Sequence, residues 1–547
     1  GNFLEPRKTK DGRDLEGGRE LLQRKLTGYI SYVRGENPYT FPYRIYPDIF
    51  DESKLIRSNN YPKLQMNKKP IESPLEHLPL YTNNMGEYQS RVYNFIMNHL
   101  RTKIFTTTLL GNQRNMPTFD NMESFGYTLL TNPIQCLNIV YPNTDFDENR
   151  PVIEEKENEE PSTVSTPQQL GSQVAEQLSS VTDRLFTGGD ETPQVNEEDD
   201  VNMTENGSLI DVMVGSRGLS NIMTYNVTKS PHMLRHSFEY KPEVVEKYGR
   251  IFSGEHLGKY SDKINNICNI IKKSKGIVMI YSQYIDSGVV PMSLALEEMG
   301  FSRFGTASYT KSLFANPPTE PIDCITMQSK SEYVATDRQF KPAKYVMITG
   351  DKFFSPNNSA DLKTVTHTNN KYGENVKVIL ITKAAAEGLD FKNVRQLHVL
   401  EPWYNASRLE QIIGRTVRNL SHCALPFEER NVEIYLHATK TLDNEEETAD
   451  MYIYRYAENK ALQIGRVTRL LKESAVDCIL NIAQTNFSLE SLTQQSAGQK
   501  IQLSLSSSQE DKTIEYEVGD KPFTEICDYM DTCNYVCNPN AQIDEKD

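Results

Sequence analysis

The sequence lacks an uninterrupted apolar run of about 18 residues, the length that a membrane-spanning helix needs. It also lacks a charged segment followed by a short apolar stretch at its start, so no signal peptide is visible. Its 547 residues include 8 cysteines, too scattered for a disulfide-rich secreted scaffold. These absences argue against a membrane protein and a small secreted domain. We therefore expect an intracellular chain with reduced thiols.

A phosphate-cradling loop is missing as well. Phosphate-loop ATPases need a G-x-x-x-x-G-K-[ST] turn and a Mg²⁺-holding Asp-Glu pair after a buried strand. The nearest segment, Gly254–Tyr260, has one residue too few between its glycines and a Tyr where the hydroxyl ligand belongs. The chain alone is therefore expected to be inactive as an ATP hydrolase of this type.

Basic charge is scarce in one segment only. The formal net charge is −15, but residues 145–211 hold 18 acidic against 3 basic residues. This stretch is poor in aromatic residues and cannot bury enough apolar surface to offset chain entropy, so we predict a disordered acidic insertion. The rest of the chain is balanced in charge, and a basic groove for nucleic acid is not excluded.

Apolar runs of strand length alternate with helical patterns in the second half of the chain. Such runs, separated by helices, predict a parallel, doubly wound sheet that is buried on both faces. Ligands of these sheets bind beyond the carboxyl ends of the strands. The predicted strands are 277–281, 345–349, 377–382, 396–401 and 432–437, with a short separate strand at 28–33, and the predicted helices are 87–102, 291–299, 407–418 and 445–481.

The segment Gln411–Arg418 carries the most informative pattern. On a helix, Gln411, Arg415 and Arg418 lie at i, i+4 and i+7, so the three side chains leave from one stripe. Two guanidiniums and an amide pointing the same way suit phosphate oxygens, and Gly414 lets a ligand come close. The pattern predicts a phosphate-binding helix; the alternative is a surface helix with solvated arginines.

A second informative segment runs from Lys377 to Phe391. It is a predicted strand followed by small residues, which permit close backbone approach. Gly388 stands before Leu389-Asp390 and allows a sharp turn that presents the Asp390 carboxylate. The alternative for this segment alone is an ordinary loop between a strand and a helix.

Together the two segments resemble the fifth and sixth conserved motifs of superfamily-two helicases and SWI/SNF-type translocases. Gly276–Gln283 resembles the fourth motif of that family, and Ile348–Gly350 resembles its short loop after the second strand. Three further phrases are similar to the large helicases of nucleocytoplasmic large DNA viruses, the group that includes the small subunit of the poxvirus early transcription factor. These phrases are 28–32 with 38–47, 215–220 and 400–405.

The resemblance implies an α/β fold: a RecA-like second helicase lobe with a doubly wound parallel sheet, α-rich extensions and the acidic insertion. It implies that Arg418 is an arginine finger on the γ-phosphate of ATP, with Arg415 and Gln411 beside it. ATP and Mg²⁺ would be held mainly by a first lobe, which we expect upstream of Gly1. Nucleotide contacts are also implied at Glu387, Gly388, Asp390 and Gly414, and nucleic-acid contacts at Tyr281, Ser282, Gln283, Thr349, Gly350, Thr382, Lys383 and Trp403.

The predicted organisation has seven parts. The parts before the lobe are an edge of the first lobe or inter-lobe connector (1–60), an inserted mixed segment (61–143), the disordered acidic linker (144–211) and a return connector (212–261). The RecA-like lobe (262–442) is followed by a helical brace (443–483) and a flexible tail with the cysteine cluster (484–547).

The function implied is the C-terminal lobe of a viral DNA-dependent ATPase that works as a helicase or translocase. Its partners would be DNA, with RNA left open, the first lobe, and viral transcription machinery in the host cytoplasm or the virion. One alternative is a non-catalytic interaction or nucleic-acid-binding module of a transcription-factor subunit.

A cysteine cluster near the C-terminus leaves one further alternative open. Cys527, Cys533 and Cys537 could supply three zinc ligands, without a fourth, or could be packed thiols. A zinc site there would favour a nuclease or a primase-associated fusion.

Overall fold

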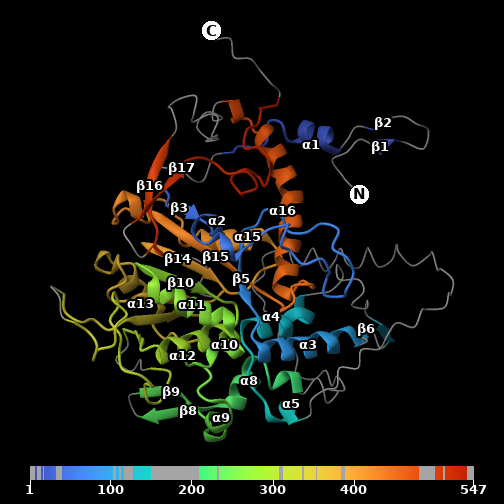
Figure 1. The fold of residues 1–547 in the computed structure, drawn as a ribbon. Helices are drawn as coiled ribbons and strands as arrows, with labels where there is room; N and C mark the ends of the chain where they lie inside the picture. The colour runs from blue at the N-terminus through green and yellow to red at the C-terminus, as the bar shows by residue number, and fades with distance from the viewer. Residues whose placement is uncertain are drawn as a thin grey trace. The chain divides into compact units, whose positions relative to one another are not determined.

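The computed structural model contains most of the predicted elements (Figure 1). The described parts of 1–142 and 210–547 form one compact unit, and those of 143–209 form another. Residues 149–208, most of the predicted acidic linker, lie outside the described part. The residues that the structure describes are 7–8, 14–15, 18–32, 40–102, 106–109, 112–115, 127–148, 209–230, 233–306, 312–334, 338–352, 354–383, 389–479, 499–508 and 512–538.

A nine-stranded sheet forms the centre of the larger unit. Its order is β11-β12-β13-β10-β14-β15-β5-β4, with β3 also paired to β15. All pairings are parallel except that of β4 with β5. The strands of the second half are β10 (Ile277–Tyr281), β11 (Ser302–Arg303), β12 (Lys344–Ile348), β13 (Val378–Ile381), β14 (Val394–Val399) and β15 (Asn431–Lys440).

The five strands predicted for the second half are confirmed as β10, β12, β13, β14 and β15. Every residue of β10, β13 and β14 is buried. A strand that is covered on both faces has no polar face to alternate with, so a continuous apolar run is its local signature. The α/β fold with a mostly parallel sheet is therefore as the sequence predicted.

Three N-terminal strands extend this sheet. They are β3 (Tyr43–Ile45), β4 (Leu55–Ile56) and β5 (Leu80–Asn84), and β5 pairs in parallel with the carboxyl half of β15. The sequence analysis predicted a connector and an insertion in these regions, and no strands. Parallel pairing joins segments far apart in the chain and leaves no local pattern that a single sequence reveals.

The predicted helices are present, with some shorter bounds. Helix α3 (Glu87–Thr102) has the predicted bounds, and α12 (Val290–Glu298) follows β10. Helix α16 (Ala449–Glu473) is shorter than predicted and runs from the sheet toward the C-terminal segment (Figure 1). Helix α15 (Ala406–Ile413) ends before the two arginines of the phosphate pattern.

Two local predictions are wrong. Residues 27–32 form a turn and an irregular segment rather than a strand. The tail was expected to be loosely ordered, but β16 (Lys500–Ser504) and β17 (Thr513–Glu517) form an antiparallel hairpin. Leu503 and Val518 are buried in one cluster with Tyr43, which gives this hairpin an apolar anchor that its Ser/Gln-rich composition hid.

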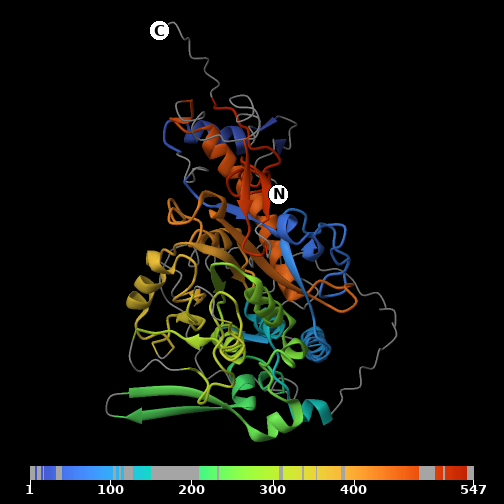
Figure 2. The ribbon, with the colours of Figure 1, turned by 60° about the vertical axis from the view of Figure 1, so that its left-hand side comes forward.

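A second antiparallel hairpin projects from the larger unit in Figure 2. It consists of β8 (Met223–Ser230) and β9 (Met233–Tyr240). Among the described helices, none is both long and apolar enough to cross a membrane.

Candidate functional site

The loops of interest gather at the carboxyl edge of the sheet. Strand β10 lies between β13 and β14, and all three run parallel. Their carboxyl ends therefore meet at one edge, which is where parallel sheets bind ligands. The segments beginning at Ser282, Thr382 and Leu400 all start there.

Arg418 and Asp390 meet at this edge. Their Nη1 and Oδ1 atoms are 2.8 Å apart, and the two side chains are 42% and 57% exposed. Beside them, Nη1 of Arg415 donates to the carbonyl of Leu389 at 3.4 Å, and the N–H of Phe391 donates to the carbonyl of Arg415 at 3.2 Å. The two segments singled out in the sequence thus lie against each other.

The predicted helical stripe is wrong in its geometry. Helix α15 ends at Ile413, Gly414 is its C-cap, Arg415 lies in the turn that follows, and Arg418 lies in irregular backbone beyond it. The buried hydroxyl of Thr416 donates to the carbonyl of Ile413 at 2.9 Å, an alternative to continued helix bonding. Gln411 remains exposed on the helix, so only the two arginines lie beside the segment of Asp390.

The structure does not test the other predicted nucleotide contacts. Glu387 and Gly388 fall in 384–388, outside the described residues. Gly414 adopts ordinary right-handed backbone, and its N–H donates to the carbonyl of Glu410 at 2.7 Å. A nucleotide contact at these three positions stays a prediction.

The hydroxyl groups predicted to meet nucleic-acid phosphates are buried. Tyr281, Ser282 and Thr349 are 3%, 1% and 1% exposed. Ser282 donates to Glu401 at 3.1 Å, and Thr349 shares a hydrogen bond with Ser355 at 2.7 Å. In this structure the two hydrogen-bonded hydroxyls shape their own loops, and a phosphate contact by any of the three stays a prediction.

The remaining predicted nucleic-acid contacts differ in exposure. Thr382 is buried and Gln283 is half-buried, whereas Lys383 and Gly350 are exposed. Only the last two could meet a phosphate from solvent without a movement of their loops.

Trp403 lies beside two cations at the same edge. The Arg408 guanidinium carbon is 4.8 Å, and the Lys383 Nζ 5.8 Å, from the centre of the Trp403 ring system. Asn405 accepts a hydrogen bond from the Arg408 N–H at 2.9 Å and so caps α15. Sequence reasoning missed Arg408; its place in the first turn of the helix after Trp403 was the available signal.

Glu401, also missed, holds the loop after β10. Its carboxylate accepts hydrogen bonds from the Gln283 N–H, from the Ser282 hydroxyl at 3.1 Å and from the Asn138 amide at 2.9 Å. Burial raises the pKa of Glu401 to about 7, although these donors oppose the shift. Glu401 is therefore a positioning residue for Ser282 and Gln283.

The C-terminal cysteines are paired rather than grouped as ligands. Cys527 bonds to Cys533, and Cys537 bonds to Cys478. No group of three metal-ligating side chains surrounds a common point in the described part of the chain. Thiols held in disulfides cannot ligate zinc, so the zinc alternative does not fit this structure. The sequence analysis expected reduced thiols, and for these four cysteines that expectation is wrong.

Residues 322–420 match the helicase conserved C-terminal domain. This span contains β12, β13, β14 and α15 together with Asp390 and Arg418. The parallel strands and the two motifs of this span are therefore those of a helicase C-terminal domain.

The chain is also similar in sequence to proteins of large DNA viruses. The chain is 39% identical over 215 residues to a protein described as an ATP-dependent RNA helicase of Acanthamoeba polyphaga mimivirus, a match that covers 38% of this chain and 22% of that protein. It is 29% identical over 246 residues to the termination factor NPH-I homologue of African swine fever virus, covering 40% and 33%. It is 28% identical over 229 residues to the early transcription factor large subunit homologue of that virus, covering 41% and 19%.

The predicted resemblance to helicases of large DNA viruses is thus confirmed. The chain spans only 22% and 33% of the first two relatives' own lengths. Their names therefore describe proteins of which this chain matches a minor part.

Proposed function

We propose that the chain supplies the arginine-bearing half of an ATP site in a viral helicase or translocase that acts on nucleic acid. The observation that carries this proposal is the Arg418–Asp390 ion pair beside Arg415, at the carboxyl edge of the parallel sheet. Both arginines follow the end of helix α15, and each side chain is held by a backbone carbonyl, that of Leu389 for Arg415 and that of Gly414 for Arg418.

The chemistry of these groups fits a transferring phosphoryl group. A guanidinium stays charged at working pH and offers planar N–H donors that match phosphate oxygens. ATP, when bound with Mg²⁺ by another lobe, supplies the γ-phosphoryl group. Arg418 would leave Asp390 to meet the charge on that group, and Arg415 would orient it. Glu387, Gly388 and the exposed Gln411 remain proposed contacts of the same site.

The nucleic-acid track is proposed along the neighbouring loops. Lys383 and Arg408 provide positive charge for phosphates, and Trp403 provides a flat ring on which a base can stack. The exposed backbone N–H of Gly350 would contribute a further donor to phosphates.

The test measures ATP turnover in a protein that contains this chain together with a phosphate-loop lobe. Arg418→Ala is expected to lower turnover by a factor on the order of 10³, by analogy with other arginine fingers. Arg418→Lys should recover little, because an ammonium cannot make the planar fork. Lys500→Ala is the control: its ion pair with Glu515 is similarly exposed, at 56% and 56%, and lies on the terminal hairpin.

Near-normal turnover in Arg418→Ala would remove the central claim. If nucleic-acid binding nevertheless depended on Trp403, the alternative of a non-catalytic binding module would stand. The names of two relatives, a termination factor and a transcription-factor subunit, favour that alternative over any other rival.

A further inference from the structure

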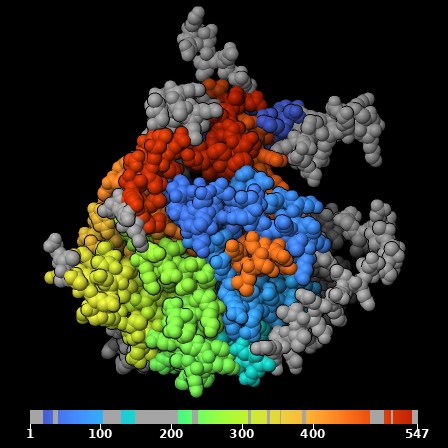
Figure 3. All heavy atoms as spheres, viewed as in Figure 1, coloured from blue at the N-terminus to red at the C-terminus, as the bar shows by residue number. Residues whose placement is uncertain are grey.

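A cavity of about 460 Å³ opens beside strands β3 and β4, and neither Arg415 nor Arg418 lines it. Five parts of the chain line it: the segment around β3, residues 55–57, the loop 76–79, Glu410 of α15 and the C-terminal stretch 516–529. Figure 3 shows the N-terminal and C-terminal segments, blue and red, side by side on one face. A volume of this size fits a small organic ligand.

Aromatic rings dominate the walls of this cavity. They come from Tyr43, Tyr46, His77, Tyr516, Phe523 and Tyr529. The rings of His77 and Phe523 stack with centroids 3.5 Å apart and planes 3° from parallel, and Tyr43 meets Tyr516 at 5.4 Å. Walls of stacked and tilted rings favour a flat, aromatic occupant.

Helix α16 fixes the first wall. The Glu458 carboxylate accepts hydrogen bonds from three successive backbone N–H groups, those of Glu76 at 2.8 Å, His77 at 2.9 Å and Leu78 at 2.5 Å. An internal carboxylate thus fills this anion-binding turn and holds His77 in place.

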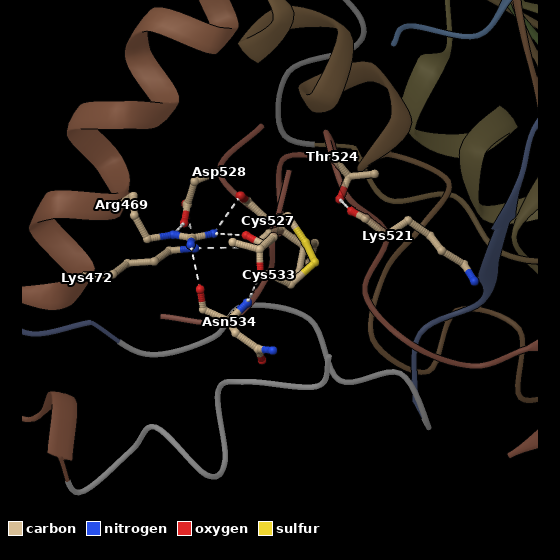
Figure 4. The surroundings of a disulfide bond; sticks show 10 residues. Arg469, Lys472, Lys521, Thr524, Cys527, Asp528, Cys533 and Asn534 are labelled. Atoms are coloured by element: carbon tan, nitrogen blue, oxygen red, sulfur yellow. Dashed lines mark hydrogen bonds and ion pairs between the residues drawn. A yellow bond between two sulfur atoms is a disulfide. The ribbon is translucent and has the colours of Figure 1, made fainter. Parts of the chain in front are cut away.

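The same helix fixes the C-terminal wall, as Figure 4 shows. Arg469 and Lys472 contact Asp528 at 2.7 Å and 2.6 Å, and Arg469 also donates to the carbonyls of Cys527, Thr532 and Asn534. The Cys527–Cys533 disulfide closes the loop covalently. Both walls are therefore preorganised by α16.

The backbone of this wall is strained. Phe523, Asp528 and Tyr529 have φ of 59°, 55° and 52°, in the left-handed region that bulky residues avoid. Such conformations persist only where surrounding contacts over-determine them, as at ligand clamps. Two of the three, Phe523 and Tyr529, line the cavity.

An ion pair at the cavity provides polar recognition. Arg44 and Glu410 are 2.6 Å apart, with side chains 16% and 15% exposed. Both side chains line the cavity, so a guanidinium and a carboxylate stand together at its wall. Side by side, they present a donor next to an acceptor, the pattern that the edge of a nucleobase complements.

We propose that this cavity binds a nucleobase, with the ring between the aromatic walls and its polar edge against Arg44 and Glu410. The base could belong to a free nucleoside or to an unpaired residue of a nucleic acid. Arg415 and Arg418 do not line the cavity, although Glu410, which does, precedes Gln411 on helix α15.

The test is calorimetric titration of the full chain with adenosine, cytidine and N-acetyl-tyrosinamide, a ring without a base edge. At least one nucleoside should bind, and the tyrosine derivative should bind at least about tenfold more weakly, because it leaves the polar groups unpaired. Ile49→Trp, at the rim, should weaken nucleoside binding about tenfold or more by filling the entrance. Ile464→Trp is the matched control, since Ile49 and Ile464 are 39% and 49% exposed and Ile464 is outside the cavity.

The possible results of this test either overturn the nucleobase site or identify the source of the base. No nucleoside binding at millimolar concentration, or equal binding by Ile49→Trp, would overturn the proposal. Equal affinity for N-acetyl-tyrosinamide would overturn the nucleobase assignment, and so would unchanged selectivity in Glu410→Gln. A single-stranded oligonucleotide that displaces the nucleoside identifies an unpaired base as the source, and one that binds without displacing it identifies a free nucleoside. Either result supports the site.

Discussion

Arg418 and Asp390 form an ion pair 2.8 Å long between two segments that are separated in sequence by strand β14 and helix α15. The pair is half exposed, and exposed pairs contribute about 0–1 kcal/mol to stability. Its position rather than its energy is therefore informative: it holds a half-exposed guanidinium at the edge where parallel sheets bind ligands.

Asp390→Asn should separate function from stability. We expect the free energy of unfolding to change by less than about 1 kcal/mol, because the pair is solvent-screened. ATP turnover should fall, by less than in Arg418→Ala, since the finger remains but loses its resting partner. Urea unfolding and an ATPase assay on the same preparation measure both quantities. A large loss of stability would show instead that the pair has a structural role.

Trp403 should report nucleic-acid binding directly, because it is the single tryptophan of the chain. A base stacked on its ring would quench its fluorescence on titration with a single-stranded oligonucleotide. Trp403→Ala should cost about 1–3 kcal/mol of affinity, the usual contribution of base stacking. Tyr29→Ala, which removes an aromatic side chain that is 87% exposed, is the control. Unchanged fluorescence at saturating oligonucleotide would assign Trp403 a packing role only.

Glu401 should make stability depend on pH. Its folded pKa of about 7 lies above the ordinary 4.5, so between these values the folded chain holds a proton that the unfolded chain has released. The protonated Glu401 therefore contributes fully to the free energy of unfolding below its unfolded pKa. This contribution is lost as the pH rises from the unfolded pKa through the folded pKa. The free energy of unfolding should fall over this interval by up to about 3 kcal/mol.

Glu401→Gln does not titrate and should remove this part of the pH dependence. Urea unfolding of both proteins at about pH 5 and about pH 8 measures the difference. If the two proteins lose the same stability over this interval, the carboxylate is not protonated in the folded state.

The two disulfides should differ in their effect on stability. Cys478–Cys537 closes a loop with a sequence separation of 59, and Cys527–Cys533 one of 6. Loop-closure entropy predicts a cost of about 4 kcal/mol for losing the first and about 2 kcal/mol for losing the second. Alanine replacement of each pair, followed by non-reducing peptide mapping and denaturant unfolding, checks pairing and energy. The reverse order would show that contacts of Arg469, rather than loop closure, dominate.

The central sheet could be predicted from the sequence because the relevant signal is local. An apolar run such as 377–382 is itself the consequence of burial on both faces, and helix α3 shows its periodicity within its own length. The loop motifs also could be read locally, since small residues, Asp390 and the arginines keep a fixed spacing along the chain.

Features that depend on distant partners could not be predicted in this way. Strand β5 pairs with β15 across most of the chain, and the cysteine pairing has several possible connectivities that composition cannot distinguish. The end of α15 at Ile413 was missed because Val417 turns into the core, at 2% exposure, and this tertiary contact outweighs a helical pattern.

The sequence by itself thus determined the class of lobe and the residues of its two principal motifs. Only the tertiary structure decided that Arg418 pairs with Asp390, that Arg408 covers Trp403, and that the tail forms a wall of a ring-lined cavity. The physical reason is range: periodicity and turn chemistry act over a few residues, whereas ion pairs, ring stacks and disulfides depend on where the folded backbone brings distant side chains together.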